Sequence, residues 1–292
     1  MIKCPPVLLG MIVSAIAFVF FTAFDTTAKY VSQNYSMFQV MAVMFVTSTL
    51  LMTAYAYVKH RANTKTVLHI HKPGLHLARG VTQIAGQTLA YLALPHVSLA
   101  EFYVMIFTSP IIVVLVSAMT LKEKIAKYVW LVLVVNFIGV LVAVRPDESM
   151  NWWTLALFMG TFMLSCSLVI LRKMMQTESS EIAAITTSGA LMIGSVIPAL
   201  FVYQEMTTHD LLLMGLGGIF FSFAQTFLTI AYRLAPTAYS SPPQFLQLIY
   251  GAIAGYLVFG DVPSMWIYVG GAIVIIANVF LIVKQQRDAA QS

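Results

Sequence analysis

Long apolar runs with almost no charge recur along the whole chain. A helix needs roughly 20 apolar residues to cross a bilayer core about 30 Å thick, and only Arg79 and Glu101 place a charge inside these runs, each near one end. The connections between runs are short apart from 59–76, so consecutive helices should be antiparallel neighbours. We therefore predict an all-α polytopic membrane protein with ten transmembrane helices over 7–24, 38–58, 77–94, 98–121, 128–144, 152–171, 182–203, 211–232, 234–260 and 262–283.

Composition and charge agree with this pattern. Hydrophobic residues make up 60% of the 292 residues and charged residues 9%, whereas soluble domains are about a quarter charged. Ten spans place both termini on one side of the membrane, and that side holds every Lys and Arg except Lys29 and Arg145. The positive-inside rule predicts cytoplasmic termini in an inner membrane. This bias explains the basic balance without a nucleic-acid partner, and the two cysteines indicate no disulfide framework.

The two halves of the sequence resemble each other. A shift of 138 residues lays 86–107 over 224–245, so that Gln87 meets Gln225, and it lays Glu123 over Asp261. Each half holds five runs, and an odd number of helices forces the halves into opposite orientations. Inverted repeats of this kind are typical of secondary transporters, whose solute site lies between the halves near the bilayer midplane. We predict a first five-helix repeat at 1–145 and a second at 146–292.

Two motif regions carry a resemblance to a known family. The stretch "RGVTQIAGQTLAYLALPHVSLAEFYVMIF", followed by "GVLVAVRP", and the stretch "YRLAPTAYSSPPQFLQLIYGAIAGYLVFGDV" resemble the two repeats of the EamA branch of the drug/metabolite transporter superfamily. The resemblance implies ten helices, cytoplasmic termini and a central cavity between two bundles. Members of the branch export amino acids and drugs, or take up riboflavin or S-adenosylmethionine-type metabolites.

Polar residues inside the apolar runs are the candidates for solute binding. In the ninth run, Ser240, Gln244 and Gln247 share a face at 100° per residue, and Pro242 and Pro243 are candidate hinges that free backbone carbonyls, which are tolerated at depth only against protein or a wet cavity. In the third run, residues spaced by four form a stripe that begins at Arg79, whose guanidinium we expect to reach the headgroups. The predicted substrate-binding residues are Gln83, Gln87, Tyr91, Gln225, Thr229, Ser240, Gln244 and Gln247. The alternative is that these groups only hydrogen-bond neighbouring helices.

Acidic residues inside spans are costly and usually functional. Asp25 and Glu101 are candidates for a proton-coupling carboxylate or a gate, although Asp25 is also placed to pair with Lys29 four residues later. Pro110 is a further candidate hinge. The three histidines of "HIHKPGLH" lack a supporting cysteine or carboxylate, so we expect no metal site there.

These features favour a secondary transporter. The sequence has no P-loop for direct use of ATP, no HExxH and no GxGD, so an intramembrane enzyme is only a remote alternative. Little fixed positive charge is expected at depth, which disfavours phosphorylated solutes. We predict a neutral, planar, hydrogen-bonding solute such as riboflavin. The alternatives are amino acid or drug export, or uptake of an S-adenosylmethionine-type solute. The expected partners are this solute, the lipid bilayer and protons as coupling ion, in a monomer or homodimer without cofactors.

Overall fold

The described part of the chain is a bundle of helices. The computed structural model describes residues 6–60, 69–93, 105–122, 125–144, 152–260 and 265–291, and no strand occurs among them. Five of its helices are long and apolar enough to cross a membrane, and the protein is an all-α polytopic membrane protein, as predicted. The elements are α1 (Pro6–Val31), α2 (Met37–Lys59), α4 (Pro73–Ala93), α6 (Ser109–Thr120), α7 (Lys127–Val144), α8 (Trp152–Met174), α9 (Ser180–Ala199), α10 (Thr208–Leu234), α11 (Thr237–Ser240), the 3₁₀ segment η2 (Pro242–Leu246), α12 (Gln247–Ala254), the π segment η3 (Gly255–Phe259) and α13 (Met265–Gln291).

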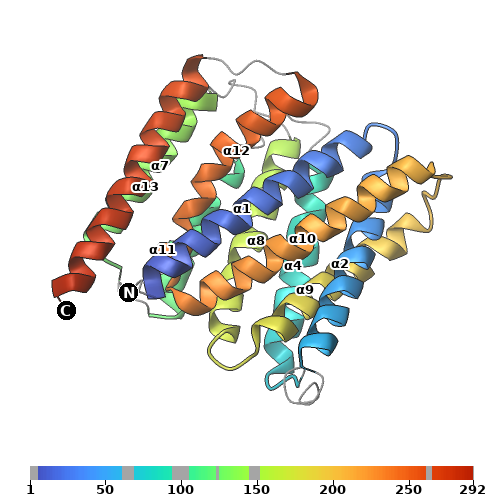
Figure 1. The fold of residues 1–292 in the computed structure, drawn as a ribbon, viewed down its shortest axis with the longest axis horizontal. Coiled ribbons are helices and arrows are strands. Elements are labelled where there is room, and N and C mark those ends of the chain that lie inside the picture. Colours follow the sequence, from blue (N-terminus) through green and yellow to red (C-terminus); the bar gives the residue numbers. More distant parts are fainter. Residues whose placement is uncertain are drawn as a thin grey trace.

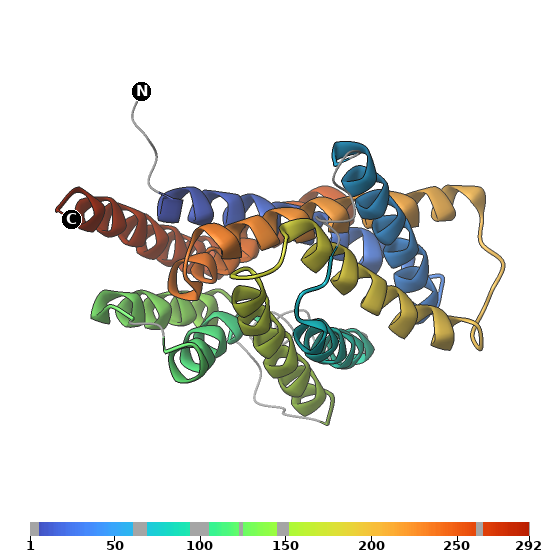
Figure 2. The same ribbon diagram turned by 90° about the horizontal axis from the view of Figure 1, so that it is seen from below.

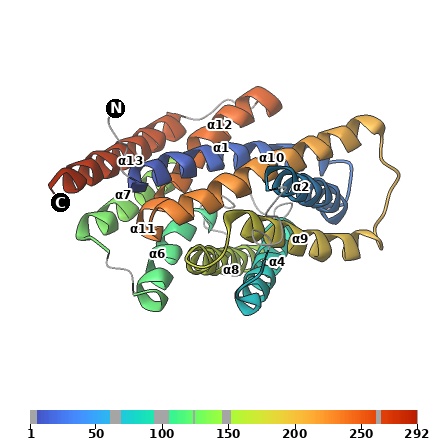
Figure 3. The same ribbon diagram turned by 60° about the horizontal axis from the view of Figure 1, so that its bottom comes forward.

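The helices pack mainly in four pairs. α1 lies along α10, α4 along α8, α2 along α9 and α7 along α13. Figure 1 shows α1 and α10 side by side across the middle of the molecule, with α7 and α13 together at one edge. The turned views show that α1 and α10 form one layer and that α4 and α8 lie on the other side of the bundle (Figures 2 and 3). The polar faces of α4 and α10 therefore meet between the two layers.

Glycines let α4 approach α8 and α10 approach α2 closely. α4 and α8 meet at Gly86 and Gly160, where a Cβ on Gly86 would lie 2.8 Å from the carbonyl oxygen of Gly160. α10 approaches the backbone of α2 in the same way at Gly218. Small residues serve this purpose in membrane helices, because association there depends on close van der Waals contact. The contacts fix the rotation of α4 and α10 and thus the direction of their polar residues.

The ninth predicted run is not one continuous α-helix. It passes from α11 through the 3₁₀ segment η2 into α12 and then into the π segment η3. Pro242 and Pro243 stand at the start of η2, where they remove two backbone donors. The carbonyl of Ser240 instead accepts a 2.6 Å hydrogen bond from the hydroxyl of Ser14 on α1. The break is thus held by a neighbouring helix.

The first helix is longer than its apolar run. The run ends at residue 24, but α1 continues through Asp25 and Lys29 to Val31. Threonine hydroxyls in this last part bond back to the carbonyls four residues earlier, as Thr26 does to Thr22 at 2.7 Å. Asp25 therefore lies within the helix and within the bundle.

Candidate functional site

A cavity of about 130 Å³ lies between the α1/α10 layer and the α4/α8 layer. η2, α12 and the start of α6 complete its wall. Its aromatic lining comes from Phe18, Phe21, Phe24, Tyr91 and Phe221. Its polar lining comes from Asp25, Arg79, Gln83, Gln87, Tyr91, Ser109, Thr161, Gln225, Gln244 and Gln247.

Most of the predicted binding residues lie together in this cavity. Gln83, Gln87 and Tyr91 approach from α4, because a spacing of four keeps them on one helical face. Gln225 approaches from α10, and Gln244 and Gln247 from the η2–α12 junction. Their role in binding a solute stays a prediction, but the structure places their side chains around one space.

Two predicted residues do not line the cavity. Thr229 is fully buried and its hydroxyl bonds the carbonyl of Thr226 at 2.8 Å. Ser240 is also fully buried, and its hydroxyl lies 3.1 Å from the carbonyl of Ala235. The prediction for Ser240 assumed an unbroken α-helix through Gln244. The 3₁₀ segment that follows the prolines changes the rotation per residue, so the two side chains separate.

Several buried polar atoms of the cavity wall lack a partner among the described residues. They are Nε2 of Gln225, Oε1 of Gln244 and Nε of Arg79. Leaving a buried polar atom unpaired costs about 1–3 kcal/mol, and all three atoms belong to residues that line the cavity. Gln83 differs, because its Oε1 accepts a 2.6 Å hydrogen bond from Ser167. Gln225 and Gln244 therefore each keep an unused polar atom, which a bound solute could pair.

Asp25 lies at one end of the cavity and is held by Tyr91, whose hydroxyl donates a hydrogen bond to its carboxylate. The predicted alternative, an ion pair with Lys29, is not present: the ammonium of Lys29 lies 5.1 Å from the ring centre of Phe259. The carboxylate thus faces the cavity. Its role in coupling stays a prediction. Glu101, the other candidate carboxylate, lies outside the described residues.

Arg79 corrects two expectations. We expected its guanidinium to reach the headgroups, but the residue is 2% exposed and lines the cavity, where Nη1 donates to the carbonyl of Ala183 at 3.1 Å. Sequence spacing gave the correct helix face but could not show that α9 covers this end of α4. Because the buried Arg79 lines the cavity, the expectation of little positive charge at depth was also wrong.

A buried glutamate joins the segments next to Arg79. The Glu178 carboxylate accepts hydrogen bonds from the backbone amides of His71 and Lys72, at 3.0 and 2.7 Å, just before α4. Arg233 at the end of α10 donates to the Glu178 carbonyl. Burial alone raises the pKa of the Glu178 carboxyl, but the bonds from Lys72 and His71 outweigh it and hold the pKa below its usual range. Sequence reasoning missed this residue, which lies in a short connection without a motif.

The histidines near this connection have other partners than a metal. Nδ1 of His76 lies 2.7 Å from the hydroxyl of Thr186, and Nδ1 of His71 lies 3.4 Å from Glu178. Among the described residues, no group of three or more metal-binding side chains occurs.

The three candidate hinges lie at helix breaks beside the cavity. Pro110 is in the first turn of α6, directly after a turn at 107–108, and its neighbour Ser109 lines the cavity. Pro242 and Pro243 begin η2. The prediction that these positions act as hinges concerns motion and stays open.

Many cavity-lining residues recur in pairs at separations of 138 or 140 positions. Five pairs are separated by 138 positions, the same shift that aligns the two halves of the sequence, and two pairs from α1 and α8 are separated by 140. The pairs are Gln83 and Phe221, Gln87 and Gln225, Ala90 and Leu228, Ile106 and Gln244, Ser109 and Gln247, Phe21 and Thr161, and Phe24 and Leu164.

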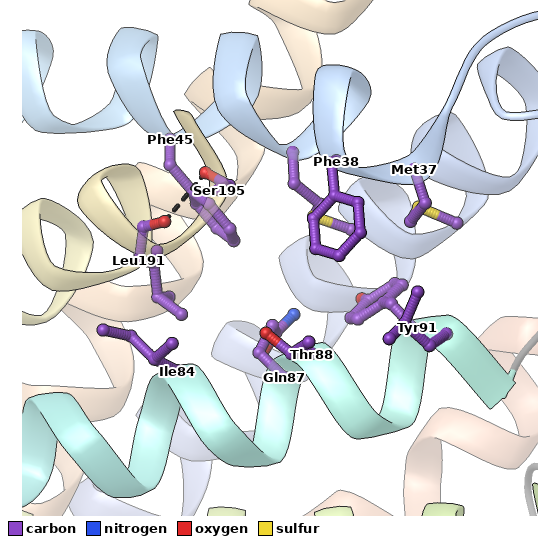
Figure 4. Close-up of a pocket in the computed structure, with 12 residues that line it drawn as sticks. Met37, Phe38, Phe45, Ile84, Gln87, Thr88, Tyr91, Leu191 and Ser195 are labelled. Carbon is purple, nitrogen blue, oxygen red and sulfur yellow. Dashed lines mark hydrogen bonds between the residues drawn. The ribbon is translucent and has the colours of Figure 1, made fainter. Parts of the chain in front are cut away.

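A smaller pocket of about 30 Å³ borders the cavity on the side of α2 and α9. Figure 4 shows Gln87, Thr88 and Tyr91 pointing from α4 toward Phe38 and Phe45 on α2. Gln87 and Tyr91 line both spaces. They form part of the partition between them, so a rotamer change at either would alter the shape of the larger cavity.

The chain is similar to known transport proteins. Residues 8–145 match the EamA-like transporter family. The chain is 26% identical over 230 residues to a riboflavin transporter of Rhizobium johnstonii, covering 75% of this chain and 74% of that protein. It is 24% identical over 265 residues to an S-adenosylmethionine uptake transporter of Rickettsia prowazekii, covering 90% and 89%. A solved crystal structure has a TM-score of 0.74 at 14% identity, covering 94% of this chain and 98% of that one, which shows a shared fold.

Proposed function

This chain is an EamA-type protein of the drug/metabolite transporter superfamily, and from that premise we propose that it moves a small organic metabolite across the inner membrane by alternating access through the cavity. The observation that carries the proposal is the cavity itself, because amides from α4, α10 and η2 line it and those of Gln225 and Gln244 each have an unpaired polar atom. Buried polar groups without partners are costly in a fold and useful in a binding site.

We propose that the chain consists of two inverted five-helix repeats, at 1–145 and 146–292. The 138-residue separation of facing cavity residues supports this division. Hydrogen bonds between corresponding helices of the two halves support it too: Ser188 donates to Ser48 at 3.0 Å between α2 and α9, and Asn278 donates to Asn136 at 2.9 Å between α7 and α13. A cavity at the repeat interface is where alternating access requires the solute site.

The first candidate solute is a neutral planar molecule such as riboflavin. The amides of Gln87, Gln225 and Gln244 offer both donors and acceptors for a heteroaromatic ring system, and the phenylalanines beside them offer faces for stacking. The relative from Rhizobium johnstonii is named a riboflavin transporter.

A specific observation favours a second candidate, a charged solute of the S-adenosylmethionine or amino acid class. The cavity carries a carboxylate at Asp25 and a guanidinium at Arg79. Asp25 contacts Tyr91, which lies 12 residues after Arg79 along α4, so the two charges lie toward different ends of this helix. Solutes of this class carry both a carboxylate, which would pair with Arg79, and a cationic group, which would pair with Asp25. We place the N- and C-termini in the cytoplasm and assign proton coupling to Asp25.

Uptake into proteoliposomes tests the function and separates the candidates. Purified full-length protein is reconstituted, and labelled riboflavin, S-adenosylmethionine and an amino acid panel are offered with and without an imposed proton gradient. Saturable uptake of one class, abolished in empty liposomes, is expected. Absence of saturable uptake for every solute in both gradient directions would refute the proposed solute classes.

A further inference from the structure

Arg79 is a buried cation in the cavity without a carboxylate partner among the described residues. Among the described residues, its guanidinium donates one hydrogen bond, from Nη1 to the carbonyl of Ala183, and it interacts electrostatically with the phenol of Tyr232. Its Nε is buried and unpaired. Glu178, which lies nearby in the connection to α9, uses its carboxylate on the backbone amides of His71 and Lys72. The positive charge of Arg79 is therefore not balanced by the protein around it.

The surroundings of Arg79 are those of a binding group. A guanidinium presents five donors in a planar fork that matches carboxylate and phosphate groups. One of these donors is used by Ala183, the residue is 2% exposed, and Arg79 is among the residues that line the cavity. An isolated buried charge is unfavourable unless a partner of opposite charge joins it.

We propose that the cavity contains an anion subsite, in which Arg79 binds a carboxylate or phosphate group of the transported solute. Gln83, one turn along α4, lies beside this subsite and is fixed by Ser167 through its amide oxygen, so its amide nitrogen is directed away from that bond. The inference rests on the proposed transport function and deepens it, because it requires the solute to be anionic at one end.

Binding of matched solute pairs to purified full-length protein in nanodiscs tests the subsite. One pair is flavin mononucleotide and riboflavin, which differ by a phosphate. The other is S-adenosylmethionine and its decarboxylated form, which differ by a carboxylate. In at least one pair, the wild-type protein should bind the member that carries the phosphate or carboxylate more tightly by about tenfold, as expected for a charge-assisted contact. The pair that shows the difference tells phosphate from carboxylate.

Variants separate the subsite from general electrostatics. Arg79→Gln should remove the preference for the member that carries the phosphate or carboxylate while the member without it still binds, and Arg79→Lys should keep part of the preference. Lys173→Gln is the matched control, because Lys173 is an exposed cation at the same end of the bundle outside the cavity, and it should leave the preference unchanged.

The outcomes distinguish the inference from the function. Wild-type protein that binds both members of each pair equally would overturn the anion subsite, even if Arg79→Gln failed to fold, and would leave the transport function standing. An unchanged preference in Arg79→Gln would overturn the anion subsite too. If Arg79 had only a structural role, the substitution would change the melting temperature and leave the binding preference as it was. Absence of binding by all four compounds would refute the proposed solutes, and the subsite with them.

Discussion

Replacing Gly218 by alanine places a methyl group where α10 has no room for one. The new Cβ would lie 2.4 Å from the carbonyl oxygen of Met44 and 2.7 Å from the Cβ of Thr47, both on α2. The oxygen belongs to the helix backbone and cannot rotate away, so α10 must move as a unit. That movement would shift Phe221 and Gln225, which follow on the same helix and line the cavity.

The net effect follows from two opposing terms. Alanine is favoured over glycine in a helix by about 0.8–1 kcal/mol, whereas forcing extra volume into a packed contact costs about 1–3 kcal/mol. The free energy of unfolding should therefore fall by up to about 2 kcal/mol. Gly215→Ala is the matched control on the same helix, because no atom lies within 4 Å of its added Cβ. Gly215→Ala gains only the higher helix propensity of alanine, so its free energy of unfolding should rise slightly.

Thermal unfolding of the purified variants in one detergent measures the difference. Gly218→Ala should melt below the wild-type protein and Gly215→Ala at or above it. Equal melting temperatures for the two alanine variants would show that α2 and α10 are not in the close contact described above.

The remaining predictions concern the cavity and the connection beside it. Gln87→Ala and Gln225→Ala should each lower solute uptake about tenfold or more, because each removes a hydrogen-bonding amide from the site; uptake unchanged in both would refute the cavity assignment. Asp25→Asn should abolish the response of uptake to a proton gradient, and Tyr91→Phe should weaken it; a full response in Asp25→Asn would exclude this carboxylate from coupling. Glu178→Gln should lower the melting temperature at neutral pH. The pKa of Glu178 is depressed in the folded protein, so its stabilising contribution is present above the usual carboxyl range and is lost as the pH falls through the folded value. Melting of the wild-type protein should thus decline in acid more steeply than melting of Glu178→Gln, and identical pH profiles would contradict this role.

The sequence predicted the helices well because hydrophobic length alone determines a membrane span. Ten apolar runs correspond to the helices, and the stripe through Gln83 and Gln87 faces the cavity as helical spacing requires. Periodicity failed where the helix type changed: the 3₁₀ segment after Ser241 rotates Ser240 away from Gln244. Spacing within one helix cannot predict such a change, because it depends on which neighbouring helix bonds the freed backbone groups.

Contacts between distant segments were beyond sequence reasoning. The burial of Arg79 depends on α9, which lies about 100 residues later in the chain, and the partner of Asp25 is Tyr91 on another helix. Local spacing suggested Lys29 for Asp25 and the headgroups for Arg79. Both suggestions considered only the helix that carries the residue, whereas the bundle offered closer partners.

The paired lining of the cavity has a consequence for vectorial transport. The paired positions mostly carry different groups: Gln87 and Gln225 are alike, whereas Gln83 is paired with Phe221 and Ile106 with Gln244. The two charged positions add to this difference, because Arg79 corresponds to Gly217 and Asp25 to Ser165 at the same separations of 138 and 140. The backbone plan of the cavity is therefore repeated while its chemistry is not, so a solute meets different groups on the inward and the outward journey.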